Sequence, residues 1–307
     1  MLSFFKSKNK NYRIGLCLSE HSLSLVLIDL VNKKTPRIKN SFHYEFSSTE
    51  EGLDVARQQL IHFVEQNGLK NIDCYCVLSK EDYQLLLVEP PEVPESELLD
   101  AMKWKVKDLA NVDIEKTVID IFPQPENKML YAVVAEKTVI VRLIDLVKNA
   151  GLLLTAIDIE ELSYRNFFCN RMDGQDGIED RGLAVISIYK NEGHLLILKD
   201  GNIFLSRQFS INYGAGVFDD IPEDEVILEL QRSLDYYERQ MRQPAPAEII
   251  FCGDIDDEKI TPLIRDSFQQ KIRCADMSPM LGEHQLQMAP EAALKLSGAA
   301  LRLKAAS

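Results

Sequence analysis

The chain has 307 residues, 46% of them hydrophobic, which is enough to bury the core of one large α/β unit or of two domains. Its formal net charge of −13 argues against a nucleic-acid-binding protein, because such proteins carry an excess of basic residues. No signal peptide is visible, and no apolar run approaches the roughly 18 residues that a transmembrane helix needs. We therefore expect a soluble, cytoplasmic protein that does not itself span a membrane. Residues 1–10 combine two phenylalanines with three lysines, so they form either a disordered polar tail or a segment that touches a membrane surface.

The six cysteines and five histidines give no sign of a metal site. No Cys-x-x-Cys pair is present, and no histidine lies at zinc-finger spacing. Cys17, Cys74 and Cys252 have apolar neighbours in strand-like segments, which is typical of reduced cysteines that act as small core hydrophobes.

Apolar residues alternate with other residues over 14–28 and are interrupted by a polar turn, which predicts a β-hairpin. A strand at 38–46 follows it. Residues 49–67 have apolar side chains at three- and four-residue spacing, which predicts a helix with Thr49 as its N-cap. A strand at 72–78 completes this part of the chain.

Residues 81–152 form a separate block that contains a proline-rich segment and its own set of predicted strands and helices. Prolines 90, 91 and 94 separate a strand at 83–89 from a helix at 97–109. Strands at 118–122 and 129–135 and a helix at 138–150 follow, so this block is predicted to be a compact α/β subdomain inserted into a larger lobe.

The residues after 152 contain a second hairpin with the same apolar pattern as the hairpin at 14–28. A strand at 153–159, a helix at 161–170 and a glycine- and acid-rich linker at 173–180 precede a second apolar hairpin at 184–198. A strand at 203–209, a strongly amphipathic helix at 223–242, a strand at 248–252 that leads into Gly253, and helices at 260–270 and 291–303 complete the prediction.

Two such hairpins and a late strand that ends in glycine are the layout of the actin/Hsp70-type ATPase fold, in which two ribonuclease-H-like lobes face each other. The predicted organisation has a first lobe at 11–80, the inserted subdomain at 81–152, and the rest of the first lobe with a linker at 153–180. The second lobe follows at 183–215, 216–246 (a helical subdomain) and 247–290, and a C-terminal helix occupies 291–307.

In that fold each hairpin turn contacts nucleotide phosphates, an acidic side chain holds hydrated magnesium, and glycines let the backbone approach. The first hairpin here carries Gly15, Cys17 and Ser19, and the second has Ser187 and Tyr189 where ATP-binding relatives read Asp-x-Gly. Neither a thiol nor a hydroxyl supplies the negative charge that orders hydrated magnesium, and Tyr189 is bulky. Gly253 is kept but is followed by Asp254 instead of a second glycine. The sequence therefore predicts a degenerate cleft with weak or absent ATP binding and no ATP turnover.

The order and spacing of these pieces resemble the PilM-type proteins of type IV pilus biogenesis, and among them most closely the MshI-type members of mannose-sensitive haemagglutinin (MSHA) pilus systems. The resemblance covers almost the whole chain. It is carried by the hairpin at 13–28, the helix at 97–109, the strand at 118–120, residues 150–152 and 157–158, the second hairpin, the helix at 229–237, residues 251–253 and residues 299–302.

The resemblance implies an actin-like fold with a PilM/FtsA-type inserted subdomain, related also to the cytoplasmic part of GspL proteins. It implies a scaffold on the cytoplasmic face of the inner membrane that binds the N-terminal tail of a single-pass PilN-like protein, and a contact with the assembly ATPase as a further partner. The tail-binding groove would lie between the first lobe and the inserted subdomain, and we place Tyr83, Leu85, Leu87 and Trp104 near it. The lone Trp104 is either a core residue or an exposed partner contact.

Two other functions stay open. An ATP-dependent switch would need other magnesium ligands, for which Glu20, Glu192 and Asp254 are the candidates. A polymerising actin-like filament is the third reading. A P-loop ATPase is excluded, because no Gly-x-x-x-x-Gly-Lys-Ser/Thr motif is present.

Several charged residues have two interpretations. Asp158, Glu160 and Glu161 could include a general base, or they could be acids at the start of a helix, which the helix dipole favours. Glu229 and Arg232 would border an adenosine pocket in the family, yet their i,i+3 spacing also predicts a simple surface ion pair. His21 and His194 occupy equivalent halves of the two hairpins, either at the cleft mouth or as surface histidines beside turns.

Overall fold

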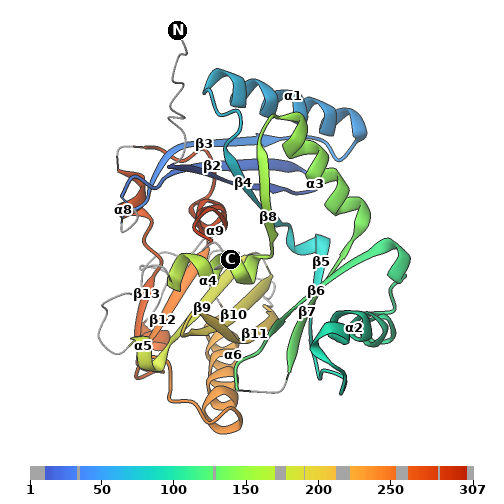
Figure 1. The fold of residues 1–307 in the computed structure, drawn as a ribbon. Coiled ribbons are helices and arrows are strands. Elements are labelled where there is room, and N and C mark those ends of the chain that lie inside the picture. Colours follow the sequence, from blue (N-terminus) through green and yellow to red (C-terminus); the bar gives the residue numbers. More distant parts are fainter. Residues whose placement is uncertain are drawn as a thin grey trace. The chain divides into compact units, whose positions relative to one another are not determined.

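The computed structural model describes residues 11–32, 35–126, 129–169, 178–189, 191–211, 222–253, 262–282 and 284–302. These residues form two compact units (Figure 1). The first unit comprises the described residues of Met1–Phe122, Tyr131–Phe167 and Met277–Ser307, and the second comprises those of Pro123–Leu130 and Phe168–Asp276.

The first unit is built on a five-stranded sheet in the order β3-β2-β1-β4-β8. Strands β1, β2 and β3 form an antiparallel meander, and β4 and β8 continue the sheet in parallel with β1. Leu16 pairs with Leu25 and both enter the same core, so the apolar alternation fixes the register of the first hairpin. The strands are β1 (Tyr12–Leu18), β2 (Ser22–Asp29), β3 (Arg37–Glu45), β4 (Asp73–Leu78) and β8 (Leu153–Asp158).

Helices cover both faces of this sheet. The hydrophobic core of the first unit, called the first core below, is covered by two helices. Helix α1 (Glu50–Gln66) buries an apolar stripe in it, and α3 (Lys137–Asn149) adds buried leucines. Thr49 accepts a hydrogen bond from the Gly52 N–H at 3.1 Å, which confirms it as the N-cap of α1. Helix α9 (Pro290–Ala300) lies on the side of the sheet opposite α1 (Figure 1).

Helix α9 packs with its backbone close to the sheet. A Cβ atom at Gly15 in β1 would lie 1.9 Å from the Leu296 carbonyl oxygen, and one at Gly298 would lie 2.0 Å from the Ser163 carbonyl oxygen. The Arg13 guanidinium donates hydrogen bonds to the carbonyls of Ala300 and Arg302, at 3.0 and 2.8 Å, and so satisfies the end of α9. The last described helix is therefore an integral part of the first sheet's packing.

A smaller block is inserted between β4 and β8. Its three-stranded sheet has the order β5-β7-β6, and its helix α2 (Glu95–Ala110) buries Met102 and Val106. The strands are β5 (Tyr83–Val88), β6 (Thr117–Pro123) and β7 (Leu130–Glu136), and two 3₁₀ turns, η1 (Lys80–Asp82) and η2 (Ile114–Lys116), accompany them.

The second unit repeats the topology of the first. Its sheet has the order β11-β10-β9-β12-β13, with an antiparallel meander β9-β10-β11 and parallel β12 and β13. The strands are β9 (Leu183–Tyr189), β10 (Glu192–Lys199), β11 (Asn202–Ser210), β12 (Glu248–Gly253) and β13 (Lys271–Cys274). Helix α6 (Glu223–Asp235) packs on its core and continues as a π-helical turn, η3 (Tyr236–Gln240).

Several details differ from the sequence-based expectation. The helix predicted over 223–242 changes to a π-helical turn after Asp235, and β13 and α8 (Ser278–Leu281) were not predicted. Within 260–270 the structure describes α7 (Pro262–Asp266), and 173–177 of the predicted linker lie outside the described residues. The remaining helices are α4 (Glu160–Cys169) and α5 (Ile178–Arg181). The described residues from Met277 onward group with the first unit.

Candidate functional site

The turn of the first hairpin is closed by its own serines. Ser19 Oγ lies 2.8 Å from Ser22 Oγ and accepts a hydrogen bond from the Ser22 N–H at 3.0 Å. A serine that bonds to nearby backbone in this way stabilises a tight turn. Ser19 is thus explained by the turn, and Gly15 by its contact with α9, without reference to a ligand.

Cys17 lies beside a paired ammonium group. Lys295 Nζ of α9 is 2.8 Å from Glu160 Oε1 and 3.9 Å from Glu291 Oε1. Burial raises the pKa of the half-buried Cys17 thiol to about 12, and the Lys295 charge offsets only part of this effect. Burial lowers the pKa of Lys295, but Glu160 and Glu291 outweigh it and leave that pKa above its ordinary value. The position therefore presents a neutral thiol next to a fixed positive charge.

The acids at the start of α4 are each paired, which favours the structural interpretation over a general base. Asp158 is buried and forms an ion pair with Arg302. Its Oδ2 atom is buried with no hydrogen-bond partner among the described residues, and burial raises the pKa of this carboxyl although Arg302 opposes the shift. The three partners, Lys80, Lys295 and Arg302, were missed by sequence reasoning.

Glu161 joins α4 to the entry of the inserted block. It is fully buried, accepts a hydrogen bond from the Tyr83 hydroxyl at 2.6 Å and pairs with Lys80 Nζ at 2.7 Å. Tyr83, which we predicted to lie near the partner groove, is therefore a buried anchor of this network.

In the second hairpin, Ser187 is buried on β9 and lies opposite His194 of β10. His194 is buried and lies 2.9 Å from Ser206 Oγ, so its interpretation as a surface histidine was wrong. His21 does lie at the surface, 3.8 Å from the exposed Glu20. Tyr189 ends β9 with 53% of its surface exposed.

Glu229 and Arg232 form the predicted i,i+3 ion pair, at 2.7 Å. Glu229 also pairs with Arg207 of β11 at 2.8 Å, a partner that the sequence did not reveal. Gly253 ends β12 with φ of +107°, and a Cβ there would lie 2.4 Å from the Ile188 carbonyl oxygen. This glycine is required by packing against β9. Asp254 lies outside the described residues.

The inserted block has two different sides. Leu85 of β5, Phe122 of β6 and Val133 of β7 all pack against the first core, so they share one side of the small sheet. On this side Leu87 and Val118 continue the alternation and are 41% and 38% exposed. We call these five residues the open face.

Trp104 does not belong to the open face. Val88 and Val134 point to the other side of the small sheet, and the buried Met102 and Val106 of α2 cover that side. Trp104 lies between these two residues in sequence and is 65% exposed, so it points away from the sheet, with Lys107 Nζ 5.3 Å from its ring centroid. The structure therefore separates Trp104 from Leu85 and Leu87, which the sequence had grouped together.

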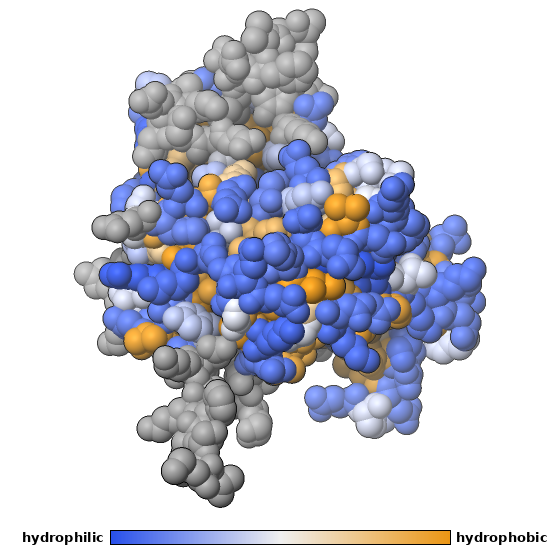
Figure 2. All heavy atoms as spheres, turned by 90° about the horizontal axis from the view of Figure 1, so that it is seen from above, coloured by the Kyte–Doolittle hydropathy of each residue, from blue (hydrophilic) through white to orange (hydrophobic). Residues whose placement is uncertain are grey.

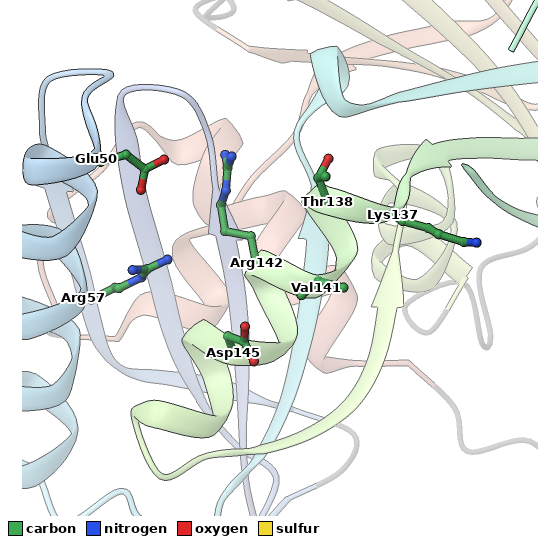
Figure 3. Close-up of a pocket in the computed structure, with 7 residues that line it drawn as sticks. All are labelled: Glu50, Arg57, Lys137, Thr138, Val141, Arg142 and Asp145. Carbon is green, nitrogen blue, oxygen red and sulfur yellow. The ribbon is translucent and has the colours of Figure 1, made fainter. Parts of the chain in front are cut away.

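A pocket of about 420 Å³ lies between α1 and α3 of the first unit (Figure 3). Arg57 and Arg142 extend into the gap between the helices, whereas Lys137 points away from α1. Arg57 pairs with Asp54 at 2.7 Å. The lining is of mixed charge and includes none of the predicted nucleotide or partner residues: Glu50, Arg57, Lys137, Thr138, Val141, Arg142 and Asp145.

The surface on the α1 side is mainly polar. Hydrophilic side chains cover most of the face in Figure 2, and apolar side chains show between them. Among the helices that the structure describes, none has the length and apolarity needed to cross a bilayer. In the same residues no group of three or more His, Cys, Asp or Glu side chains is placed to hold a metal ion.

No family model matches the chain, and no curated protein sequence matches it. Solved structures do match. A chain of the PilM–PilN type IV pilus biogenesis complex aligns with a TM-score of 0.67 at 16% identity, over 94% of this chain and 97% of that chain. A Bacteroides thetaiotaomicron protein with an actin-like ATPase fold and unknown function gives 0.53 at 12% identity, over 97% and 99%. The cytoplasmic domain of EpsL, an inner membrane component of the Vibrio cholerae type II secretion system, gives 0.53 at 10% identity, over 95% and 96%.

These matches confirm the predicted actin-like α/β fold. They extend over nearly the whole length of each chain, so the inserted block belongs to the shared architecture and is not an appendage. At such low sequence identity the similarity establishes the fold, and the chemistry has to be judged from the residues described above.

Proposed function

We propose that this chain is a non-catalytic actin-like scaffold of a type IV pilus assembly platform, of the MSHA type that the sequence resembles. It would act at the cytoplasmic face of the inner membrane and bind the N-terminal cytoplasmic tail of a PilN-like membrane protein. The observation that supports this most is the similarity, over 94% of the chain, to a chain of the PilM–PilN complex.

The open face is the surface that we assign to the tail. Leu87 and Val118 expose apolar area there, next to Leu85 and Phe122, which are anchored in the first core. An extended peptide that places alternate side chains on such a sheet face gains affinity from apolar burial and specificity from the spacing of its side chains. Trp104 is on the other side of the block, so one short tail does not need to reach it.

The absence of ATP turnover is part of the proposal. Magnesium requires hard oxygen ligands, whereas the first hairpin offers a neutral Cys17 thiol beside the paired Lys295 ammonium. In the second hairpin, Ser187 is buried, and the last residue of β9 is the bulky Tyr189. The residues that are present therefore do not fit a magnesium-bound nucleotide.

The partner assignment is tested by titrating a synthetic tail of the PilN-like protein from the same genome into the folded protein. Leu87→Ala should weaken binding about tenfold, because it removes part of the buried apolar contact. Leu228→Ala is the matched control, since Leu228 is similarly exposed, at 45%, but belongs to the second unit. Trp104→Ala should bind like the unmodified protein. Normal binding by the Leu87 variant would remove the open face from the proposal, and loss of binding by the Trp104 variant would move the site to the outer side of α2.

The nucleotide part is tested separately by calorimetric titration with ATP and magnesium. We expect no heat at protein concentrations that would detect a dissociation constant near 100 μM, which corresponds to about −5.5 kcal/mol. Clear one-site binding would instead favour the ATP-dependent switch, and light scattering with and without nucleotide would detect the filament alternative.

A further inference from the structure

The apolar pattern of the open face is interrupted by Asp120 of β6. This residue lies two positions from both Val118 and Phe122, so the alternation along the strand puts its side chain on the same side of the small sheet. Aspartate is depleted in β-strands, and a charge between two apolar side chains contributes nothing to a core. Positions at which a residue contradicts its local structure are commonly functional, which marks Asp120 as a candidate contact.

The carboxylate of Asp120 is available to a partner from outside the chain. The residue is exposed, and its Oδ1 atom accepts a hydrogen bond from the adjacent Ile121 N–H at 2.9 Å. No basic side chain in the part of the chain that the structure describes forms an ion pair with it. Asp100 of α2, by contrast, is already paired with Lys103 at 2.7 Å.

The inserted block that carries this face is acidic. Residues 81–152 contain fourteen acidic and eight basic side chains, so they account for almost half of the net charge of −13. Segments of membrane proteins that lie next to the cytoplasmic end of a transmembrane helix are enriched in lysine and arginine. The charge of the block therefore complements a basic cytoplasmic tail, and such complementarity sets specificity and register.

We propose that Asp120 pairs with a lysine or arginine of the bound tail and thereby fixes the register of the tail on the open face. Side chains two residues apart in an extended strand are about 7 Å apart, both in β6 and in the tail. A tail that runs along β6 and packs an apolar side chain on Val118 therefore brings a basic side chain, two positions away, to Asp120. The inference rests on the proposed function and deepens it, because it specifies an apolar and a basic residue at this spacing in the partner.

Calorimetric titration with two peptides tests the inference: the natural tail described above, and a copy in which every lysine and arginine is replaced by glutamine. Asp120→Asn should bind the natural tail about fivefold more weakly than the unmodified protein does, because a charge-assisted contact is lost. The asparagine side chain keeps an oxygen that can accept from the Ile121 N–H, so the fold is preserved. The glutamine copy should bind both proteins equally well. Added salt should weaken natural-tail binding more for the unmodified protein than for Asp120→Asn.

Asp108→Asn is the matched control, because Asp108 is an exposed acid of the same block but lies on α2, four residues after Trp104. It should change the affinity less than twofold. Equal losses in the two variants would show that only the net charge of the block matters, and would overturn the inference. Unchanged tail binding by Asp120→Asn would also overturn it, and new self-association of that variant would then assign the acid to protection of the edge strand β6.

The two proposals fail in different ways. If Leu87→Ala weakens binding of the tail and Asp120→Asn does not, only the assignment of Asp120 falls. If the unmodified protein binds no tail, or if Leu87→Ala binds normally, the open face is not the tail site, and the assignment of Asp120 falls with it.

Discussion

The two five-stranded sheets have the same strand order and the same directions, yet the faces of their first hairpins are filled differently. In the first sheet the middle of β1 is Gly15, because the backbone of α9 crosses it at contact distance. At the matching position of the second hairpin β9 has Val185, whose side chain is buried. One topology thus tolerates a helix backbone on one sheet and a branched side chain on the other.

The ion pairs of the two units also differ. The first unit anchors α4 and α9 through ion pairs whose acids are buried or nearly so, at Asp158, Glu160 and Glu161. In the second unit the buried Glu248 lies at the start of β12 and pairs with Arg273 and Lys271 of β13, whose side chains are 33% and 75% exposed. The sharpest difference is between Glu161 of the first unit, whose partner Lys80 is 25% exposed, and Glu248 of the second, whose partner Lys271 is 75% exposed.

The largest effect should come from Glu161→Ala, which leaves the Lys80 ammonium and the Tyr83 hydroxyl without their acceptor. We expect the free energy of unfolding to fall by about 3–5 kcal/mol. The matched change Glu248→Ala should cost about 1–2 kcal/mol, because water can solvate the released Arg273 and Lys271. Urea denaturation measures both values, and equal losses would break the contrast between the units.

A smaller loss is expected for Gly15→Ala. The added methyl group meets a backbone oxygen that cannot rotate away, so we expect about 2–3 kcal/mol of destabilisation from overpacking. Gly68→Ala is the control within the same unit, because a Cβ there meets no atom within 4 Å and only the strain of φ +61° after the end of α1, about 1 kcal/mol, remains. If both variants unfold at the same urea concentration, α9 does not press on β1 as described.

Asp158→Asn should have the smallest effect and the clearest pH dependence. Burial raises the folded-state pKa of this carboxyl, so the folded protein holds the proton more tightly than the unfolded chain does. The stability it contributes is present below the unfolded pKa of about 3.9 and is lost as pH rises through the higher folded pKa. At pH 7 the variant should therefore be within about 1 kcal/mol of the unmodified protein. Greater relative stability of the unmodified protein at pH 7 than at pH 4 would mean that the Arg302 ion pair outweighs burial.

Local periodicity predicts much of this fold. The segment predicted as a helix over 49–67 is α1, and the hairpins at 14–28 and 184–198 are β1-β2 and β9-β10. Short elements without a period, such as β13, were missed because four residues carry no usable pattern.

The site was less accessible from sequence for a different physical reason. Lys295 and Glu160 are 135 residues apart, and Arg302 and Asp158 are 144 apart, so no local pattern reveals that they meet. The separation of Leu87 from Trp104 depends on which side of a small sheet a helix covers, and this is set by tertiary packing. The chemical types of Cys17 and Ser187, by contrast, could be read directly.

The placement of α9 has a consequence for how the protein is made. Arg13 in β1 bonds to the carbonyl of Ala300, 287 residues later, so the face of the first sheet that α9 covers stays open until nearly all of the described chain has been synthesised. The second unit lies between these two elements in sequence and can fold first, while β1, β2 and β4 wait with one apolar face uncovered. A chain that ends before α9 would contain all of the second unit but a first sheet with one apolar face exposed, so chaperones should bind preferentially to that sheet.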